Sequence, residues 1–196
     1  MTVRVVPLTG KEIAPALSAL ARLRMAVFRD WPYLYDGSLA YEETYLAKLA
    51  AAEDATVVAA YAGEEIVGCA TAAPMTEVEP ELVEPFEAYG IDVGRIFYCG
   101  ESVLLPAYRG RGVGHAFFDH REAQAVKAGR FTHVAFCAVV RPDDHPLRPK
   151  DYVPLDAFWG KRGYAKVEGL LGRFTWKDID QPGETEKPMQ FWMRAL

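Results

Sequence analysis

A glycine-rich turn between a strand-like run and a helix-like run is the feature that most constrains the fold of this sequence. Its residues are Arg109, Gly110, Arg111, Gly112, Val113 and Gly114. The preceding run, 95–105, has the apolar character of a strand and stops at Pro106, whereas apolar side chains recur at helical spacing in 113–128. Glycines let a backbone approach a bulky anion, and unpaired N–H groups at a helix start attract phosphate oxygens. The turn therefore predicts a phosphate-binding site, to which the two arginines add positive charge.

Two common phosphate-binding motifs do not fit this turn. A P-loop requires Gly-Lys-Ser or Gly-Lys-Thr, and neither tripeptide occurs in the sequence. The dinucleotide fingerprint G-x-G-x-x-G fails because His115 stands where its third glycine belongs. That fingerprint also follows the first strand of its fold, whereas this turn comes after about the fourth expected strand. The pattern that does fit is R-x-x-G-x-G.

Hydrophobic periodicity predicts alternating strands and helices along the whole chain. The expected strands are 3–7, 56–62, 66–73, 95–105, 131–140, 166–176 and 189–193, and the expected helices are 11–28, 41–52, 113–128 and 155–162. The acidic segment 76–92 is expected to form a loop with a short helix. Because no internal repeat or linker interrupts this order, we expect one domain over residues 1–196.

The motif and this element order resemble the GCN5-related N-acetyltransferase (GNAT) family. Residues 104–110, Leu-Leu-Pro-Ala-Tyr-Arg-Gly, are similar to the segment that leads into the family's cofactor loop, and residues 158–164, Phe-Trp-Gly-Lys-Arg-Gly-Tyr, resemble its fourth helix. The resemblance covers nearly the whole chain. It implies a single-domain α+β (α/β) fold with a mixed central sheet of about seven strands flanked by about four helices.

The resemblance also implies an N-acetyltransferase that uses acetyl-CoA (coenzyme A) as co-substrate and no metal. The cofactor-binding residues that it implies are Val103, Leu104 and Leu105 beside the pantetheine arm, and Arg109, Gly110, Arg111, Gly112, Val113, Gly114 and His115 at the pyrophosphate. A small-molecule primary amine is the acceptor that we expect.

Glu101 is the candidate general base. An amine with a pKa near 10.4 is almost fully protonated at neutral pH, so a base must remove a proton before the nitrogen can attack a thioester. The resemblance places such a base on the fourth strand, where Glu101 has apolar neighbours. The alternative is a strand-end carboxylate that pairs with an arginine or points to solvent.

The sequence offers more than one proton donor for the departing thiolate. Family members commonly have a tyrosine in the fourth helix, but Trp159 stands at that position, and an indole cannot serve as an acid. Tyr152 is the candidate catalytic acid, with packing or substrate contact as the alternative. Tyr164 is expected to pack in the core, and unassisted departure of the thiolate stays open.

Two loops are expected to enclose the acceptor. The loop between the first two helices contains Trp31, Tyr33 and Tyr35, and the proline-rich loop 141–154 contains Arg141 and Arg148. Aromatic walls with a few charges would orient a small amine-bearing ligand. The alternative is that these rings only anchor the loops on the core.

Composition excludes several classes of function. With 22 basic and 27 acidic side chains, the net charge is −5, which argues against nonspecific nucleic-acid binding. No stretch has the length of a membrane span, and the N-terminus lacks the apolar core of a signal peptide. The cysteines Cys69, Cys99 and Cys137 lie in apolar runs and are expected to be reduced, as in a cytoplasmic protein. The four histidines show no metal-ligand spacing.

The sequence is compatible with three functions. The leading candidate is an amine acetyltransferase. A non-catalytic acyl-CoA-binding sensor module and an acyltransferase that acts on a hydroxyl are the alternatives. The sequence does not fix the oligomeric state, and a homodimer is one state that it allows.

Overall fold

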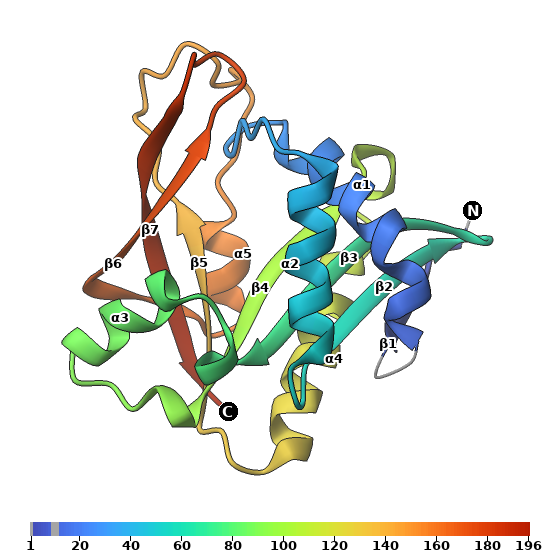
Figure 1. Ribbon diagram of the computed structural model, residues 1–196, viewed down its shortest axis with the longest axis vertical. Coiled ribbons are helices and arrows are strands. Elements are labelled where there is room, and N and C mark those ends of the chain that lie inside the picture. Colours follow the sequence, from blue (N-terminus) through green and yellow to red (C-terminus); the bar gives the residue numbers. More distant parts are fainter. Residues whose placement is uncertain (1, 9–11) are drawn as a thin grey trace.

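The computed structural model describes residues 2–8 and 12–196 and shows a layered α/β molecule (Figure 1). The strands are β1 (Arg4–Leu8), β2 (Thr56–Ala62), β3 (Glu65–Pro74), β4 (Ile96–Leu104), β5 (His133–Val139), β6 (Ala165–Lys177) and β7 (Glu184–Ala195). The helices are α1 (Leu17–Phe28), α2 (Leu39–Ala51), α3 (Pro80–Ala88), α4 (Val113–Ala128) and α5 (Asp156–Lys161). In the view of Figure 1, α1, α2 and α3 lie in front of the sheet, and α4 and α5 lie behind it.

All seven strands form one mixed sheet in the order β1-β2-β3-β4-β5-β7-β6. Neighbouring strands are antiparallel except β4 and β5, which are parallel. The predicted fold class and element order are confirmed. The described residues form five α-helices rather than about four, because the short helix expected in the acidic segment, α3, is present.

Two element boundaries differ from the prediction by more than two residues. The first helix was expected to begin at residue 11, which lies outside the described residues; α1 begins at Leu17, after a 3₁₀ turn at Ala14–Ala16 that contains Pro15. The last strand begins at Glu184 instead of Met189. Its first three residues, Glu184, Thr185 and Glu186, are polar and exposed, and they are held by pairing with β6, so hydrophobic alternation could not reveal them.

The sheet buries both of its faces. On β2, Val57 and Ala59 pack in the cluster formed with α1 and α2, whereas Val58 and Ala60 pack against Phe117 of α4. This alternation follows from the two-residue period of a strand. Burial on both faces explains why the central strands read as nearly continuous apolar runs.

The parallel neighbours β4 and β5 separate after a short contact. Only residues 96–98 of β4 pair with 133–135 of β5, and beyond them β5 stays paired with β7 up to Val139. Figure 1 shows the two strands diverging toward their carboxyl ends. The chain leaves β4 at this opening and turns into α4, so the predicted phosphate-binding turn lies beside the gap between the strands.

Candidate active site

The turn after β4 has the backbone that its glycines predict. A 3₁₀ turn at Pro106–Tyr108 is followed by Gly110 with φ 73° and Gly112 with φ 80°, and α4 starts at the next residue. Both glycines are in the left-handed region, which side chains with a Cβ rarely adopt. A Cβ built on either glycine meets no atom within 4 Å, so open space lies over this part of the turn.

The N-terminus of α4 presents unpaired donors at the same place. Ala116 N bonds to Gly112 O at 3.2 Å, so the amides of the three residues before Ala116 have no acceptor within the helix. The 16 residues of α4 add the positive end of a helix dipole. The predicted bounds of this helix, 113–128, are confirmed, and Gly129 follows its last residue with φ 72°.

The two arginines of the turn donate hydrogen bonds to backbone carbonyls just before it. Arg109 Nε donates to Leu104 O at 3.2 Å, and Arg111 Nη2 donates to Ala107 O at 3.0 Å. Both residues are exposed. The open space, the helix amides and the two cationic groups suit a phosphate-bearing ligand such as coenzyme A.

A β-bulge determines which face of the sheet Glu101 occupies. Between the pairs Ala70↔Ser102 and Ala72↔Cys99, the single residue Thr71 of β3 opposes Gly100 and Glu101 of β4. Before the bulge, Tyr98 packs with α3; after it, Val103 packs with α1 and α2 on that same face. The extra residue reverses the alternation and keeps Glu101 on the face that α1 and α2 cover.

Gly100 is required at this bulge by close packing. A Cβ at position 100 would lie 2.6 Å from Thr71 Oγ1 and 3.4 Å from the Tyr45 hydroxyl oxygen. The same Thr71 hydroxyl accepts a hydrogen bond from Glu101 N at 3.3 Å. Thr71 therefore fixes the backbone of the candidate base through its side chain.

The Glu101 carboxylate is buried and paired with an arginine, the partner named in the alternative reading. Its Oε1 lies 2.5 Å from Arg24 Nη1, and its Oε2 accepts from the Tyr45 hydroxyl at 3.3 Å. Only 7% of Glu101 is exposed. The base role of Glu101 stays a prediction.

Arg24 is shared between two buried carboxylates. Its Nε lies 2.5 Å from Glu42 Oε2, and Glu42 is fully buried. Burial opposes the charge on Arg24, but Glu101, Tyr45 and Glu42 outweigh this effect, so the pKa of Arg24 lies well above its ordinary value. The guanidinium also lies 4.5 Å from the centre of the Tyr45 ring. Helices α1 and α2 are thus tied to β4 through one cation.

Tyrosine hydroxyls enclose this buried group. Burial, and then the charge of Glu101, raise the pKa of Tyr45. Burial, and then Cys137, raise the pKa of Tyr33, and burial followed by Glu42 raises that of Tyr35. These tyrosines are therefore neutral hydrogen-bond donors at physiological pH.

The predicted acceptor residue Arg141 ties three segments together. Its Nε donates to Pro32 O at 2.8 Å and its Nη2 to Tyr33 O at 2.6 Å, and both Nη atoms bond to Asp178. Burial opposes ionisation of Asp178, but Arg141 and then Lys187 outweigh it and lower the pKa of Asp178. The arrangement joins the α1–α2 loop, the loop after β5 and the β6–β7 hairpin.

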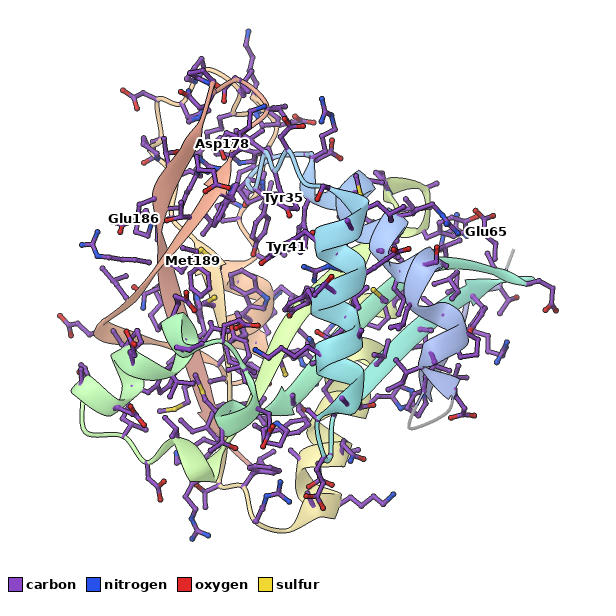
Figure 2. All side chains as sticks on the ribbon, in the orientation of Figure 1. Tyr35, Tyr41, Glu65, Asp178, Glu186 and Met189 are labelled. Atoms are coloured by element: carbon purple, nitrogen blue, oxygen red, sulfur yellow. The ribbon has the colours of Figure 1, made fainter. Side chains whose placement is uncertain are left out.

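The aromatic loop between α1 and α2 lies against that hairpin. Tyr35 forms a bridge with Asp178, and the two residues lie side by side in Figure 2. The Tyr33 ring stacks 6.0 Å from Trp176, whose Nε1 donates to Tyr33 O at 3.0 Å. Tyr33 and Tyr35 are both partly exposed, so they combine a packing role with access to solvent.

The other predicted acceptor residues meet at the tip of the loop after β5. The Trp31 ring lies 5.1 Å from His145 and 5.8 Å, edge-on, from Tyr152. Arg148 lies over the Tyr152 ring at 5.6 Å and forms an ion pair with Asp143. Trp31 Nε1 is buried and has no hydrogen-bond partner in the part of the chain that the structure describes. Burial, and then the charge of Asp156, raise the pKa of Tyr152, so its hydroxyl stays protonated at neutral pH.

Trp159 and Tyr164 belong to an aromatic cluster behind the sheet. Trp159 lies 5.0 Å from Phe136 and 5.2 Å from Trp192. Tyr164 is buried, and its hydroxyl donates to Glu122 Oε1 at 2.9 Å. The expectation that Tyr164 packs in the core is confirmed. His115, at the start of α4, lies on the same side of the sheet, with its ring centre 4.9 Å from that of Phe158.

The cysteines are free thiols, as expected, and they are not grouped. Cys69 and Cys99 are buried, and Cys137 is half-buried with its Sγ 3.1 Å from the Tyr98 hydroxyl. Within residues 2–8 and 12–196, no three His, Cys, Asp or Glu side chains are arranged to hold a metal ion. In the same part of the chain, no helix is long and apolar enough to cross a membrane.

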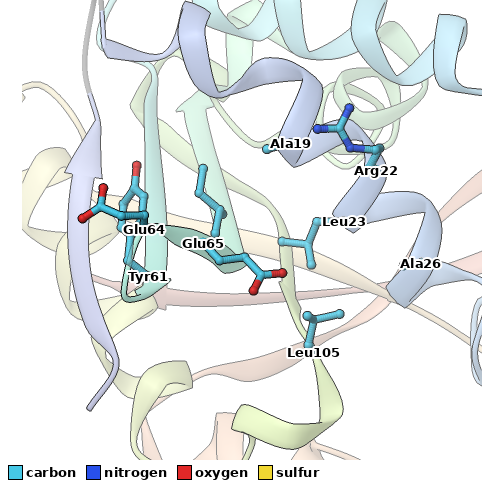
Figure 3. Close-up of a pocket in the computed structure, with 9 residues that line it drawn as sticks. Ala19, Arg22, Leu23, Ala26, Tyr61, Glu64, Glu65 and Leu105 are labelled. Carbon is cyan, nitrogen blue, oxygen red and sulfur yellow. The ribbon is translucent and has the colours of Figure 1, made fainter. Parts of the chain in front are cut away.

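An open groove of about 440 Å³ lies elsewhere, between α1 and the β2–β3 hairpin (Figure 3). Leu23, Ile66 and Leu105 form part of its apolar surface, and Glu64 and Glu65 line its acidic side. It meets the predicted cofactor residues only at Leu105 and is not lined by the Glu101 group. We therefore do not assign the acceptor to it.

The sequence matches a family model described as "Acetyltransferase (GNAT) family" over residues 20–149. The chain belongs to the GNAT family. The match spans the α1–α2 region, the β4 bulge, the turn and α4, which are the parts that form the site described above. The resemblance found in the sequence is therefore confirmed. Comparison with the curated proteins gave no significant match.

Solved structures share the GNAT fold along the whole chain. An acetyltransferase from Thermus thermophilus is 14% identical with a TM-score of 0.57, and the match covers 100% of this chain and 98% of that one. A ribosomal-protein-alanine N-acetyltransferase from Brucella melitensis is 12% identical with a TM-score of 0.61, covering 100% of both chains. A putative acetyltransferase from Acinetobacter baylyi is 15% identical with a TM-score of 0.61, covering 100% of this chain and 93% of that one. At these identities the similarity shows the fold alone.

Sequence reasoning on this GNAT protein missed the partners of Glu101. Arg24 and Glu42 lie on helices whose apolar spacing we read as core, and Thr71 lies within an apolar strand. The available signal was the charge itself, because a charged residue at an apolar helix position is rarely buried unless it is paired. Arg121, which is 1% exposed on α4, carried the same signal.

Proposed function

We propose that this GNAT protein is an acetyl-CoA-dependent N-acetyltransferase that acts on the primary amine of a small molecule. One observation carries the proposal: the glycine turn and the first amides of α4 lie where β4 and β5 separate. Two features on different sides of the sheet support it, namely a cradle for phosphate and a buried carboxylate on the face that α1 and α2 cover.

The cofactor would be held mainly by backbone groups. The amides from Arg109 to His115 would receive the pyrophosphate, with Arg109 and Arg111 adding charge. Main-chain groups of residues 103–105 would border the pantetheine arm; Leu105 N donates to Val67 O at 3.0 Å and Leu105 O accepts from Tyr108 N at 3.0 Å, so this backbone is held in place. Bound acetyl-CoA supplies a thioester whose carbonyl carbon accepts the amine nitrogen.

Glu101 would take the proton that the amine must lose. Its carboxylate is paired with Arg24, but Arg24 is also engaged by Glu42, so the cation is divided between two carboxylates. Tyr45, hydrogen-bonded to Glu101 Oε2, would orient the carboxylate or carry the proton to it. The thiolate would then be protonated by Tyr152 or leave unassisted, because a free thiol has a pKa of only about 8.5.

Replacement of Gly112 by valine tests the cofactor site. We expect Gly112→Val to weaken acetyl-CoA binding at least about tenfold, because a branched side chain would stand in the approach to the amides and strain a left-handed residue. Isothermal titration calorimetry measures the change. Gly129→Val is the matched control, since Gly129 has φ 72°, also faces open space, and lies at the opposite end of α4. Equal affinity in the two variants would refute the assignment.

Substitutions in the two aromatic loops test the acceptor site. We expect Tyr33→Phe and Arg148→Ala to raise KM for the acceptor severalfold and to leave KM for acetyl-CoA within about twofold, because they remove only acceptor-side polar groups. Tyr89→Phe is the control, since the Tyr89 hydroxyl bonds to Glu168 O at the edge of the molecule. If both Michaelis constants rise together, the loops are scaffolding.

A non-catalytic acyl-CoA sensor is the second candidate, favoured by the aromatic packing of Trp159 where relatives have an acid. Thiol release from acetyl-CoA with a panel of amines and alcohols separates the readings. Release with an amine supports the proposed function, release only with an alcohol supports a hydroxyl acceptor, and tight binding without release supports the sensor.

A further inference from the structure

Arg121 is a buried cation that the proposed chemistry does not use. It lies on the sheet-facing side of α4, two turns after the cofactor turn, and is 1% exposed. Its hydrogen-bond partners among the described residues are backbone carbonyls rather than carboxylates. Within residues 2–8 and 12–196 its buried Nη2 has no hydrogen-bond partner, and its guanidinium lies over the Phe118 ring at 4.5 Å. A buried charge with such partners costs stability, so its presence calls for a function.

The carbonyls that Arg121 holds are those of the β4 bulge. Its Nη1 donates to Glu101 O at 3.1 Å and to Thr71 O at 3.3 Å, while its Nε donates to Phe117 O on α4. Glu101 and Thr71 face each other where the ladder between β3 and β4 is interrupted. The guanidinium therefore replaces ladder hydrogen bonds that the bulge removes, and it does so from the opposite face of the sheet.

The position of the bulge decides where the Glu101 side chain points. If the bulge moved by one residue toward the carboxyl end of β4, alternation would turn Glu101 away from Arg24 and toward α4. Arg121 binds the carbonyls on both strands at this place through a single nitrogen, which favours the observed register over its neighbours. The same helix begins at the turn expected to hold the cofactor.

We propose that Arg121 is a positioning residue, which fixes the β4 bulge and so holds the Glu101 carboxylate beside Arg24 on the acceptor face. This inference rests on the proposed function, in which Glu101 is the base. It also makes α4 a link between the cofactor turn and the base, since one rigid helix carries Gly112 at its N-cap and Arg121 in its interior.

The test combines Arg121→Leu with Glu101→Gln. We expect Arg121→Leu to lower kcat about tenfold while KM for acetyl-CoA changes less than about twofold, because a small displacement of a reacting group has a large effect on rate. In the Glu101→Gln background the same substitution should change kcat by less than about twofold, because Arg121 acts through Glu101. Arg121→Lys should recover part of the loss, since an ammonium can still donate to these carbonyls.

Gln124→Leu is the matched control. Gln124 is three residues further along α4, and its side chain also donates to a backbone carbonyl, Asp54 O, away from the bulge. This variant should keep wild-type kcat. A loss of equal factor in the wild-type and Glu101→Gln backgrounds would overturn the proposal, as would full activity of Arg121→Leu.

Amide hydrogen exchange keeps the inference testable if the proposed function fails. Full turnover by Glu101→Gln would refute the base assignment but not the restraint on the bulge. In that case Arg121→Leu should still speed exchange at residues 100–102 without changing exchange at 57–60 of β2. Unchanged exchange at the bulge would overturn the positioning role whatever the activity.

Discussion

Glu101→Gln is expected to lower turnover about 100-fold or more at neutral pH, the usual scale for loss of a general base. The amide keeps the size of the side chain and removes its ability to take a proton. The deficit should shrink as the pH rises toward the pKa of the acceptor amine, because free amine then becomes abundant without a base. Initial rates of thiol release across a pH series measure both effects.

Two controls separate chemistry from structure in this experiment. Glu79→Gln removes a carboxylate that pairs with Lys48 at 2.8 Å near the surface, and it should leave turnover unchanged. Melting temperatures of both variants report on the loss of the Arg24 partner. A deficit that is the same at every pH would point to a positional or binding role for Glu101 and would contradict the base assignment.

Arg24→Met is expected to produce the largest loss of stability, about 3–5 kcal/mol in the free energy of unfolding. Methionine fills similar volume, but it leaves the buried carboxylates of Glu42 and Glu101 without their shared cation. Urea denaturation measures the change. Adding Glu42→Gln to Arg24→Met should recover part of the loss, because one of the two uncompensated charges is removed.

Arg173→Met is the matched control for this loss. Arg173 pairs with Glu186 at 2.5 Å across the β6–β7 hairpin, but both side chains are more than half exposed. Because exposed pairs contribute little, this variant should lose less than about 1 kcal/mol. Equal losses in Arg24→Met and Arg173→Met would show that the buried group contributes no more than a surface pair.

Local patterns were sufficient to predict the elements that form the cofactor turn. The bounds of α4 followed from an apolar stripe over residues 113–128, and the glycine turn before it was recognised from the motif at Arg109–Gly114. These features depend on residues a few positions apart. Strands β2 and β3 were predicted on the same grounds, from the two apolar runs 56–62 and 66–73.

The environment of Glu101 could not be predicted, because it depends on contacts between distant segments. Strict alternation would place Glu101 on the face of Phe97 and Cys99, and only the bulge against Thr71 reverses this. Its partner Arg24 comes from a helix far away in the sequence, and no local pattern pairs the two. Burial of the charge could be suspected from the apolar context, but the neutralising partner could not be identified.

The contacts that hold the acceptor loops could not be predicted from local sequence either. The aromatic residues 31–35 were recognised as unusual, but their anchoring by Arg141 depends on Asp178 in a third segment. Because the Arg141 guanidinium joins these segments, its replacement would disturb the loops as well as the acceptor site. Arg148 and Tyr33 are therefore the more informative positions for testing the acceptor.

The short parallel contact between β4 and β5 has a mechanical consequence. Within the sheet, the strands β1–β4 and the strands β5, β7 and β6 are joined by three residue pairs, whereas β5 and β7 alone share seven. The sheet therefore consists of two well-paired halves with few hydrogen bonds between them. A ligand bound where β4 and β5 separate would contact both halves and link them. Its binding would then make the two halves unfold together, as one cooperative unit.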